Sequence, residues 1–77
     1  MEVAIMEQTK MTKNFTVAVV REDDWYIARC LENGVTSQGK SVEAALQNVE
    51  EAISLFYEDE PPMDVPLVYM ANLEVVV

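Results

Sequence analysis

The sequence has 77 residues, a hydrophobic content of 51% and a formal charge of −9, from 14 acidic and five basic residues. This length is that of one small domain, and the hydrophobic content excludes a disordered chain despite the charge. No apolar run reaches the roughly 18 residues that a membrane-spanning helix needs, and no signal-peptide pattern opens the chain. We therefore expect a cytoplasmic protein without membrane contact.

The acidic residues are concentrated in the middle of the chain. Between Glu22 and Asp64 there are eleven of them, and only Arg29 and Lys40 are basic there. Such a surface has no basic patch to bind a phosphate backbone, so we expect no direct binding of nucleic acid. It would attract a basic protein partner, although solubility alone also explains the charge.

The first half of the chain predicts a loose tail followed by a β-hairpin. Residues 1–13 alternate only weakly and then become polar, which predicts a loose, flexible tail. Residues 14–22 and 25–31 are rich in β-branched and aromatic residues, and Asp23-Asp24 between them is typical of a turn. In the second strand the face that carries Trp25 and Arg29 is expected to be the solvated or partner-facing one.

A second turn, a short strand and a long helix follow. Asn33-Gly34 predicts a type I′ hairpin turn, and residues 35–38 have room for a third strand. Ser41 suits a helix N-cap, and the helix should end near Glu58, before two consecutive prolines. Its apolar positions follow helical spacing and predict the buried stripe: Val42, Ala45, Leu46, Val49, Ala52, Ile53 and Phe56.

The last stretch, residues 67–77, follows Pro66 and is apolar on both faces, which predicts a final strand. Such a strand needs an inner position in a sheet, or an edge that another subunit covers. The predicted order is therefore β-β-β-α-β, an α+β fold with an antiparallel meander and one right-handed crossover helix. The crossover would place the final strand parallel to the third.

Residues 34–41 match the phosphate-binding pattern G-x-x-x-x-G-K-S, with Gly34, Gly39, Lys40 and Ser41 at its fixed positions. We interpret the match as coincidence, because Asn33-Gly34 favours a hairpin turn and the intervening residues favour a strand. The chain also has only one crossover, which is too few for the parallel sheet of nucleotide-binding domains. We predict no cofactor.

Catalytic and metal-binding patterns are weak. The chain has no histidine, the acid run from Glu58 to Asp64 matches no calcium loop, and the serines have no base to activate them. Cys30 lies in an apolar strand and predicts a buried, reduced thiol. We therefore predict no catalytic residue, no metal site and no enzymatic activity. The one aromatic cluster beside acids is predicted to contact a partner: Glu22, Asp23, Asp24, Trp25 and Tyr26.

These residues resemble the HicB-like antitoxin family. The resemblance rests on Phe15-Thr-Val-Ala-Val, on the stretch from Glu22 to Cys30, on Ser37-Gln-Gly-Lys-Ser41, and on the run Glu43-Ala-Ala-Leu-Gln-Asn-Val-Glu-Glu-Ala-Ile53. It covers residues 15 to about 58 closely and the final strand loosely. In this family Gly39 and Lys40 are the usual strand-to-helix junction.

The resemblance implies a partial RNase H-like fold in a single domain, residues 14–77, that self-associates as a dimer or tetramer. It also implies an antitoxin of a type II toxin-antitoxin system, which covers and neutralises a small basic HicA-type toxin that cleaves mRNA. Larger members append a DNA-binding segment, and we expect this chain to be a short member without one. The alternative is a stand-alone oligomeric HicB-like protein with no toxin and a structural or regulatory role.

Overall fold

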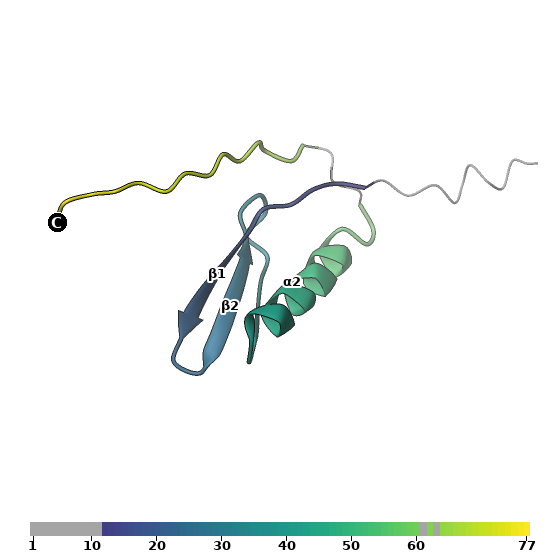
Figure 1. Ribbon diagram of the computed structural model, residues 1–77. Coiled ribbons are helices and arrows are strands. Elements are labelled where there is room, and N and C mark those ends of the chain that lie inside the picture. Colours follow the sequence, from purple (N-terminus) through teal and green to yellow (C-terminus); the bar gives the residue numbers. More distant parts are fainter. Residues whose placement is uncertain (1–11, 61, 63) are drawn as a thin grey trace, which may run out of the picture.

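The computed structural model describes residues 12–60, 62 and 64–77. Three strands and one helix follow one another in these residues: β1 (Val17–Glu22), β2 (Trp25–Cys30), β3 (Thr36–Gly39) and α2 (Val42–Phe56). The strands form one antiparallel sheet in the order β1-β2-β3, and α2 crosses one face of it (Figure 1). The predicted α+β arrangement with a three-stranded meander is confirmed.

Two turns connect the strands, and they differ. Asp23 has a φ of 56° in the two-residue turn between β1 and β2, where Glu22 pairs with Trp25. In the second turn only Gly34 has a positive φ, of 81°, so the predicted type I′ turn is wrong. The loop is longer instead, because Asn33 Oδ1 accepts a hydrogen bond from the backbone N–H of Val35 at 2.9 Å.

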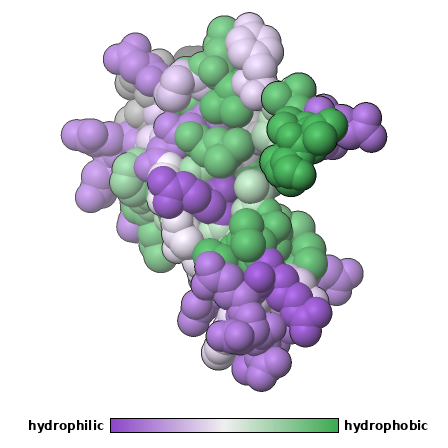
Figure 2. Space-filling view, turned by 90° about the vertical axis from the view of Figure 1, so that its left-hand side faces the viewer, coloured by the Kyte–Doolittle hydropathy of each residue, from purple (hydrophilic) through white to green (hydrophobic). Residues whose placement is uncertain are grey.

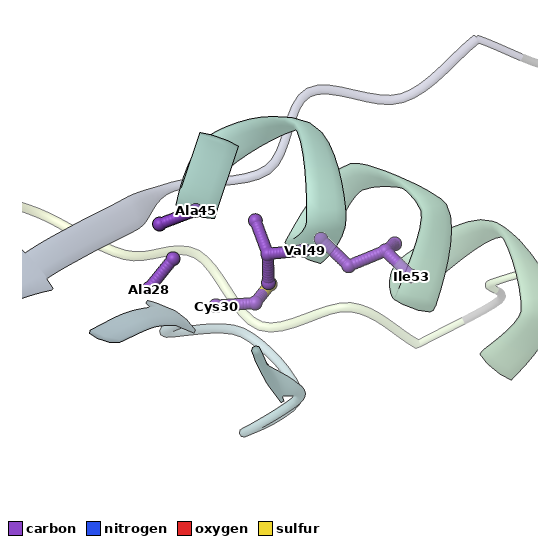
Figure 3. Close-up of a cluster of buried hydrophobic side chains, with 5 residues drawn as sticks. All are labelled: Ala28, Cys30, Ala45, Val49 and Ile53. Atoms are coloured by element: carbon purple, nitrogen blue, oxygen red, sulfur yellow. The ribbon is translucent and has the colours of Figure 1, made fainter. Parts of the chain in front are cut away.

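The core lies between α2 and the sheet. Alternate residues of β2 face the helix, so Ala28 and Cys30 are fully buried while Arg29 between them is exposed. From the helix, three side chains one turn apart point toward them (Figure 3): Ala45, Val49 and Ile53. The buried, free thiol of Cys30 agrees with the prediction.

The beginning of α2 lies where the sequence predicted it. Ser41 is the N-cap, and its Oγ accepts a hydrogen bond from the backbone N–H of Ala44 at 3.0 Å. The helix ends at Phe56, two residues before the predicted end. Only part of the predicted stripe is covered, since Val42, Leu46 and Phe56 are 44%, 39% and 58% exposed.

The predicted final strand is absent from the described residues. Residues 67–77, which we call the C-terminal arm, run away from the domain without pairing to either edge of the sheet (Figure 1). The predicted parallel pairing with the third strand is therefore wrong for this chain. The radius of gyration reflects the extended arm, at 16.2 Å against about 11 Å for a compact domain of this length.

The prediction of an N-terminal tail over residues 1–13 falls largely outside the described residues. Within them, Thr12 and Lys13 are exposed and belong to no helix or strand. In the described part of the chain, no helix is long and apolar enough to cross a membrane.

Candidate partner-binding surfaces

The structure places the five residues predicted to contact a partner at one end of the β1–β2 hairpin. Glu22, Asp23, Asp24 and Trp25 are exposed around its turn. Tyr26 is half-buried and lies on the opposite face of the sheet, because successive residues of a strand alternate. Four of the five therefore share a surface, which we call the hairpin patch, and Tyr26 is separate from it.

Two basic side chains lie beside the hairpin turn. Lys40 Nζ lies 4.1 Å from the centroid of the Trp25 ring, a cation–π contact on the open face of the sheet. The Arg21 guanidinium lies 5.9 Å from the Tyr26 ring on the covered face, and its Nε donates to the carbonyl of Asp23 at 3.2 Å. The Lys40 contact shows that the exposed indole of Trp25 accepts a cation on its face.

The eight residues of the phosphate-binding pattern do not form one loop. Thr36–Gly39 pair with β2 as a strand, Gly34 lies in the preceding turn, and Ser41 caps α2. Lys40 lies over Trp25. In a phosphate-binding loop, consecutive backbone N–H groups surround the anion, and here those of the middle of the pattern belong to a strand.

A polar cluster that the sequence analysis missed joins the start of β1 to the end of β2. The Glu32 carboxylate accepts hydrogen bonds from the backbone N–H and hydroxyl of Thr16 at 2.8 and 2.7 Å, and from Cys30 Sγ at 3.4 Å. Burial acts to raise the pKa of Glu32, but the hydrogen bonds outweigh it and lower this pKa below its usual value. Burial raises the pKa of the Cys30 thiol. Both shifts favour a structural role for the cluster.

An open groove of about 830 Å³ lies between α2 and the segment that leads into β1. Apolar side chains form most of its lining: Phe15, Val17, Leu46, Val49, Ile53 and Tyr57. Lys13 and Glu50 also lie along it. We call it the α2 groove, and no sequence pattern indicated it because it depends on where α2 crosses the sheet.

The end of α2 is fixed at one side of this groove by Tyr57. Its ring stacks on Phe15 with centroids 5.6 Å apart, and its hydroxyl accepts a hydrogen bond from Asn33 Nδ2 at 3.1 Å. The groove is therefore bounded by side chains that are held in place.

One face of the molecule shows how its exposed groups are distributed. Hydrophobic residues lie beside strongly hydrophilic ones there, without a division into one apolar and one polar side (Figure 2). Among the exposed large hydrophobic residues, Leu67, Tyr69 and Leu73 in the C-terminal arm are more than 80% exposed. The candidate interaction surfaces are thus the hairpin patch, the α2 groove and the arm.

Comparison with known proteins gives one family. No curated protein and no solved structure matches the chain. A family model described as a family of unknown function, DUF7387, matches residues 4–74, which span the tail, the α+β domain and most of the arm. Because the match covers most of the sequence, the chain belongs to the DUF7387 family.

Proposed function

We propose that this chain is a HicB-like antitoxin domain of a type II toxin-antitoxin system, with a partial RNase H-like fold. It binds and neutralises a small basic HicA-type toxin that cleaves mRNA. The proposal is supported by the resemblance of residues 15–58 to that family and by the β-β-β-α order of the described elements. In this role the chain covers the toxin and catalyses no reaction itself.

The observation that carries the proposal is the acidic surface. α2 contains no basic residue, and Glu43, Glu50 and Glu51 on it are all exposed. The exposed run Glu58-Asp59-Glu60 continues the negative charge beyond the end of the helix. Clustered exposed acids increase the association rate of a basic protein and repel nucleic acid.

The hairpin patch supplies the aromatic contact, on the face of the sheet that α2 does not cover. Trp25 is 38% exposed and already holds a lysine side chain against its ring. An arginine or lysine of the toxin can take the place of Lys40, while Asp23 and Asp24 neutralise its charge. Tryptophan with a charged surround is typical of the residues that dominate protein interfaces.

The test is coexpression with the small basic protein encoded beside this chain. Expression of that protein alone should stop growth, coexpression should restore it, and the two should copurify. If coexpression does not restore growth and the two proteins do not copurify, the proposal is wrong.

A matched pair of variants tests the hairpin patch. Trp25→Ala should weaken toxin binding at least tenfold, whereas Leu55→Ala should not change it. Both side chains are exposed, and Leu55 lies on α2 with 64% of its surface accessible. Equal affinities of the two variants, measured by calorimetry, would show that the toxin binds elsewhere.

The second candidate is a stand-alone oligomeric HicB-like protein with a structural or regulatory role. The exposed apolar arm favours it, because self-association would cover the arm without a toxin. An assembly that forms in the absence of any toxin-like neighbouring gene would support this alternative.

A further inference from the structure

The C-terminal arm exposes far more apolar surface than a folded chain leaves in water. Seven of its large side chains are between 62% and 115% exposed: Leu67, Tyr69, Met70, Leu73, Val75, Val76 and Val77. The five odd-numbered ones together present on the order of 800 Å², which is about the area that each partner buries in a standard interface. The arm therefore has enough area for a stable interface.

The arm also has the pattern of a strand with one wholly apolar face and one mixed face, where Asn72 and Glu74 lie among Val68, Met70 and Val76. Its odd-numbered residues are all apolar: Leu67, Tyr69, Ala71, Leu73, Val75 and Val77. Its even-numbered residues include Asn72 and Glu74. Since side chains alternate along a strand, the odd-numbered set would face a core and the even-numbered set would face water.

No strand in the described part of the chain pairs with the outer edge of β1, so this edge can accept such a strand. Leu31 N donates to Thr16 O at 2.8 Å, and the register pairs Val17 with Cys30. Hydrogen-bonded and non-hydrogen-bonded pairs alternate in an antiparallel ladder, so the backbone groups of Val17, Val19 and Arg21 point away from β2. They form a row at the outer edge of the sheet that has no partner strand among the described residues.

The edge of β3 is less suitable. It is only four residues long, and α2 partly covers it, because Asn48 Nδ2 donates to the carbonyl of Gln38 at 2.8 Å. α2 also packs closely on this side, where Gly39 meets the backbone of Ala44 and Ala45. The helix therefore leaves its uncovered side, with Leu46 and the α2 groove, beside β1.

We propose that the arm of one copy pairs with the β1 edge of a second copy and places its odd-numbered side chains in that copy's α2 groove. Each copy has both an arm and an acceptor edge, so two copies exchange arms around a two-fold axis and each contact occurs twice. This inference stands apart from the antitoxin role, since it concerns the apolar arm and not the acidic surface.

A second copy fits better than the chain's own sheet because of the linker between α2 and the arm. Pro62 and Pro66 fix their own φ angles, and Pro66 favours an extended conformation for Val65 before it. In the structure the arm leaves the domain after this linker and does not pair with the β1 edge of its own chain, which no other described strand occupies (Figure 1). An arm held away from its own domain is available to another.

The test is the mass of the full chain in solution, by light scattering at 50 µM, for wild type and two neighbouring arm variants. Wild type should be a dimer, at about twice the chain mass of 8.7 kDa. Val75→Asp puts a charge on the inward face twice per dimer and should weaken dimerisation at least 100-fold. Val76→Asp is the same change on the outward face and should leave the dimer intact.

A second pair tests the acceptor. Leu46→Gln in the α2 groove should weaken the dimer, whereas Leu55→Gln elsewhere on α2 should not. Circular dichroism of each variant confirms that α2 is still folded, so that loss of the dimer is not loss of the domain. A wild-type monomer at 50 µM overturns the proposal, and so does any assembly on which Val75→Asp and Val76→Asp act alike.

Discussion

Glu32 is the residue on which the first two strands depend at their open end. Its carboxylate takes the place of a backbone acceptor for Thr16 N–H, where the ladder between β1 and β2 stops. It also accepts from the Thr16 hydroxyl and from the buried thiol of Cys30. Glu32 therefore connects the Thr16 N–H, the Thr16 hydroxyl and the Cys30 thiol, although its place in a turn sequence does not indicate these contacts.

The lowered pKa of Glu32 predicts a pH-dependent stability. A carboxyl whose pKa is lower in the folded state stabilises that state above its unfolded pKa, and the effect is lost as the pH falls through the folded value. Glu32→Gln should therefore cost about 1 kcal/mol of unfolding free energy at pH 7. The gap should close as the pH falls through the folded-state pKa of Glu32, because protonation removes the charged acceptor from the wild type.

Urea unfolding at fixed protein concentration measures the unfolding free energy of wild type and Glu32→Gln at each pH. Glu51→Gln is the control, since Glu51 is exposed on α2, and it should show no such gap at pH 7. A gap for Glu32→Gln that stays unchanged down to the lowest pH at which the wild type is folded would rule out the ionised carboxylate as its cause.

At the scale of the elements, α2 lies unusually close to β3 and far from β1. Gly39 permits the close approach, because a Cβ at this position would lie 2.6 Å from Ala45 N and 2.8 Å from the carbonyl carbon of Ala44. Asn48 and Tyr57 hold the helix in this position from two sides. The tilt toward β3 is what opens the α2 groove beside β1.

Gly39→Ala should force α2 away from the sheet. The added methyl group meets backbone atoms, which cannot turn aside as a flexible side chain can, so the expected loss is about 2 kcal/mol or more. Gly34→Ala is the comparison: its φ of 81° costs an alanine roughly 1–2 kcal/mol, but its nearest neighbour is 3.7 Å away. Urea midpoints and the near-ultraviolet spectrum of Trp25 distinguish the two, and an unchanged midpoint for Gly39→Ala would contradict the close approach.

Local patterns predicted the elements well where the cause was local. The β-branched runs gave β1 and β2, and Ser41 gave the start of α2, because strand alternation and helix capping act between near neighbours. The type I′ turn failed because the Asn33 side chain bonds to Val35, which favours a longer loop. The exposure of Leu46 was also missed, since it depends on which strand the helix leaves uncovered.

At the scale of the whole molecule, two properties act against each other. The charge of −9 repels a second copy, whereas the apolar arm favours its approach. The arm's contribution is mostly apolar and depends little on salt, while repulsion between the acidic surfaces is screened within about 10 Å at 0.1 M ionic strength. Salt therefore separates the two effects.

Dimerisation by arm exchange should become tighter as salt is added. Between 20 and 300 mM sodium chloride we expect the dimer dissociation constant to fall several-fold, because screening removes the repulsion between two negative chains. Sedimentation equilibrium over this range measures it. Binding of a basic toxin to the hairpin patch should instead weaken as salt is added. A dimer that weakens with salt would indicate an interface made of ion pairs and not of the apolar arm.

The sequence by itself determined the three strands, the cap of α2, the buried Cys30, the solvated face of Arg29 and the acidic character of the surface. Each of these follows from residue type, spacing of two or 3.6, or summed charge. The tertiary structure alone decided that the last apolar stretch is an unpaired arm and that α2 leaves β1 uncovered. The physical reason is that an apolar run specifies burial but not its partner, and the partner depends on how the helix and the linker are placed in space.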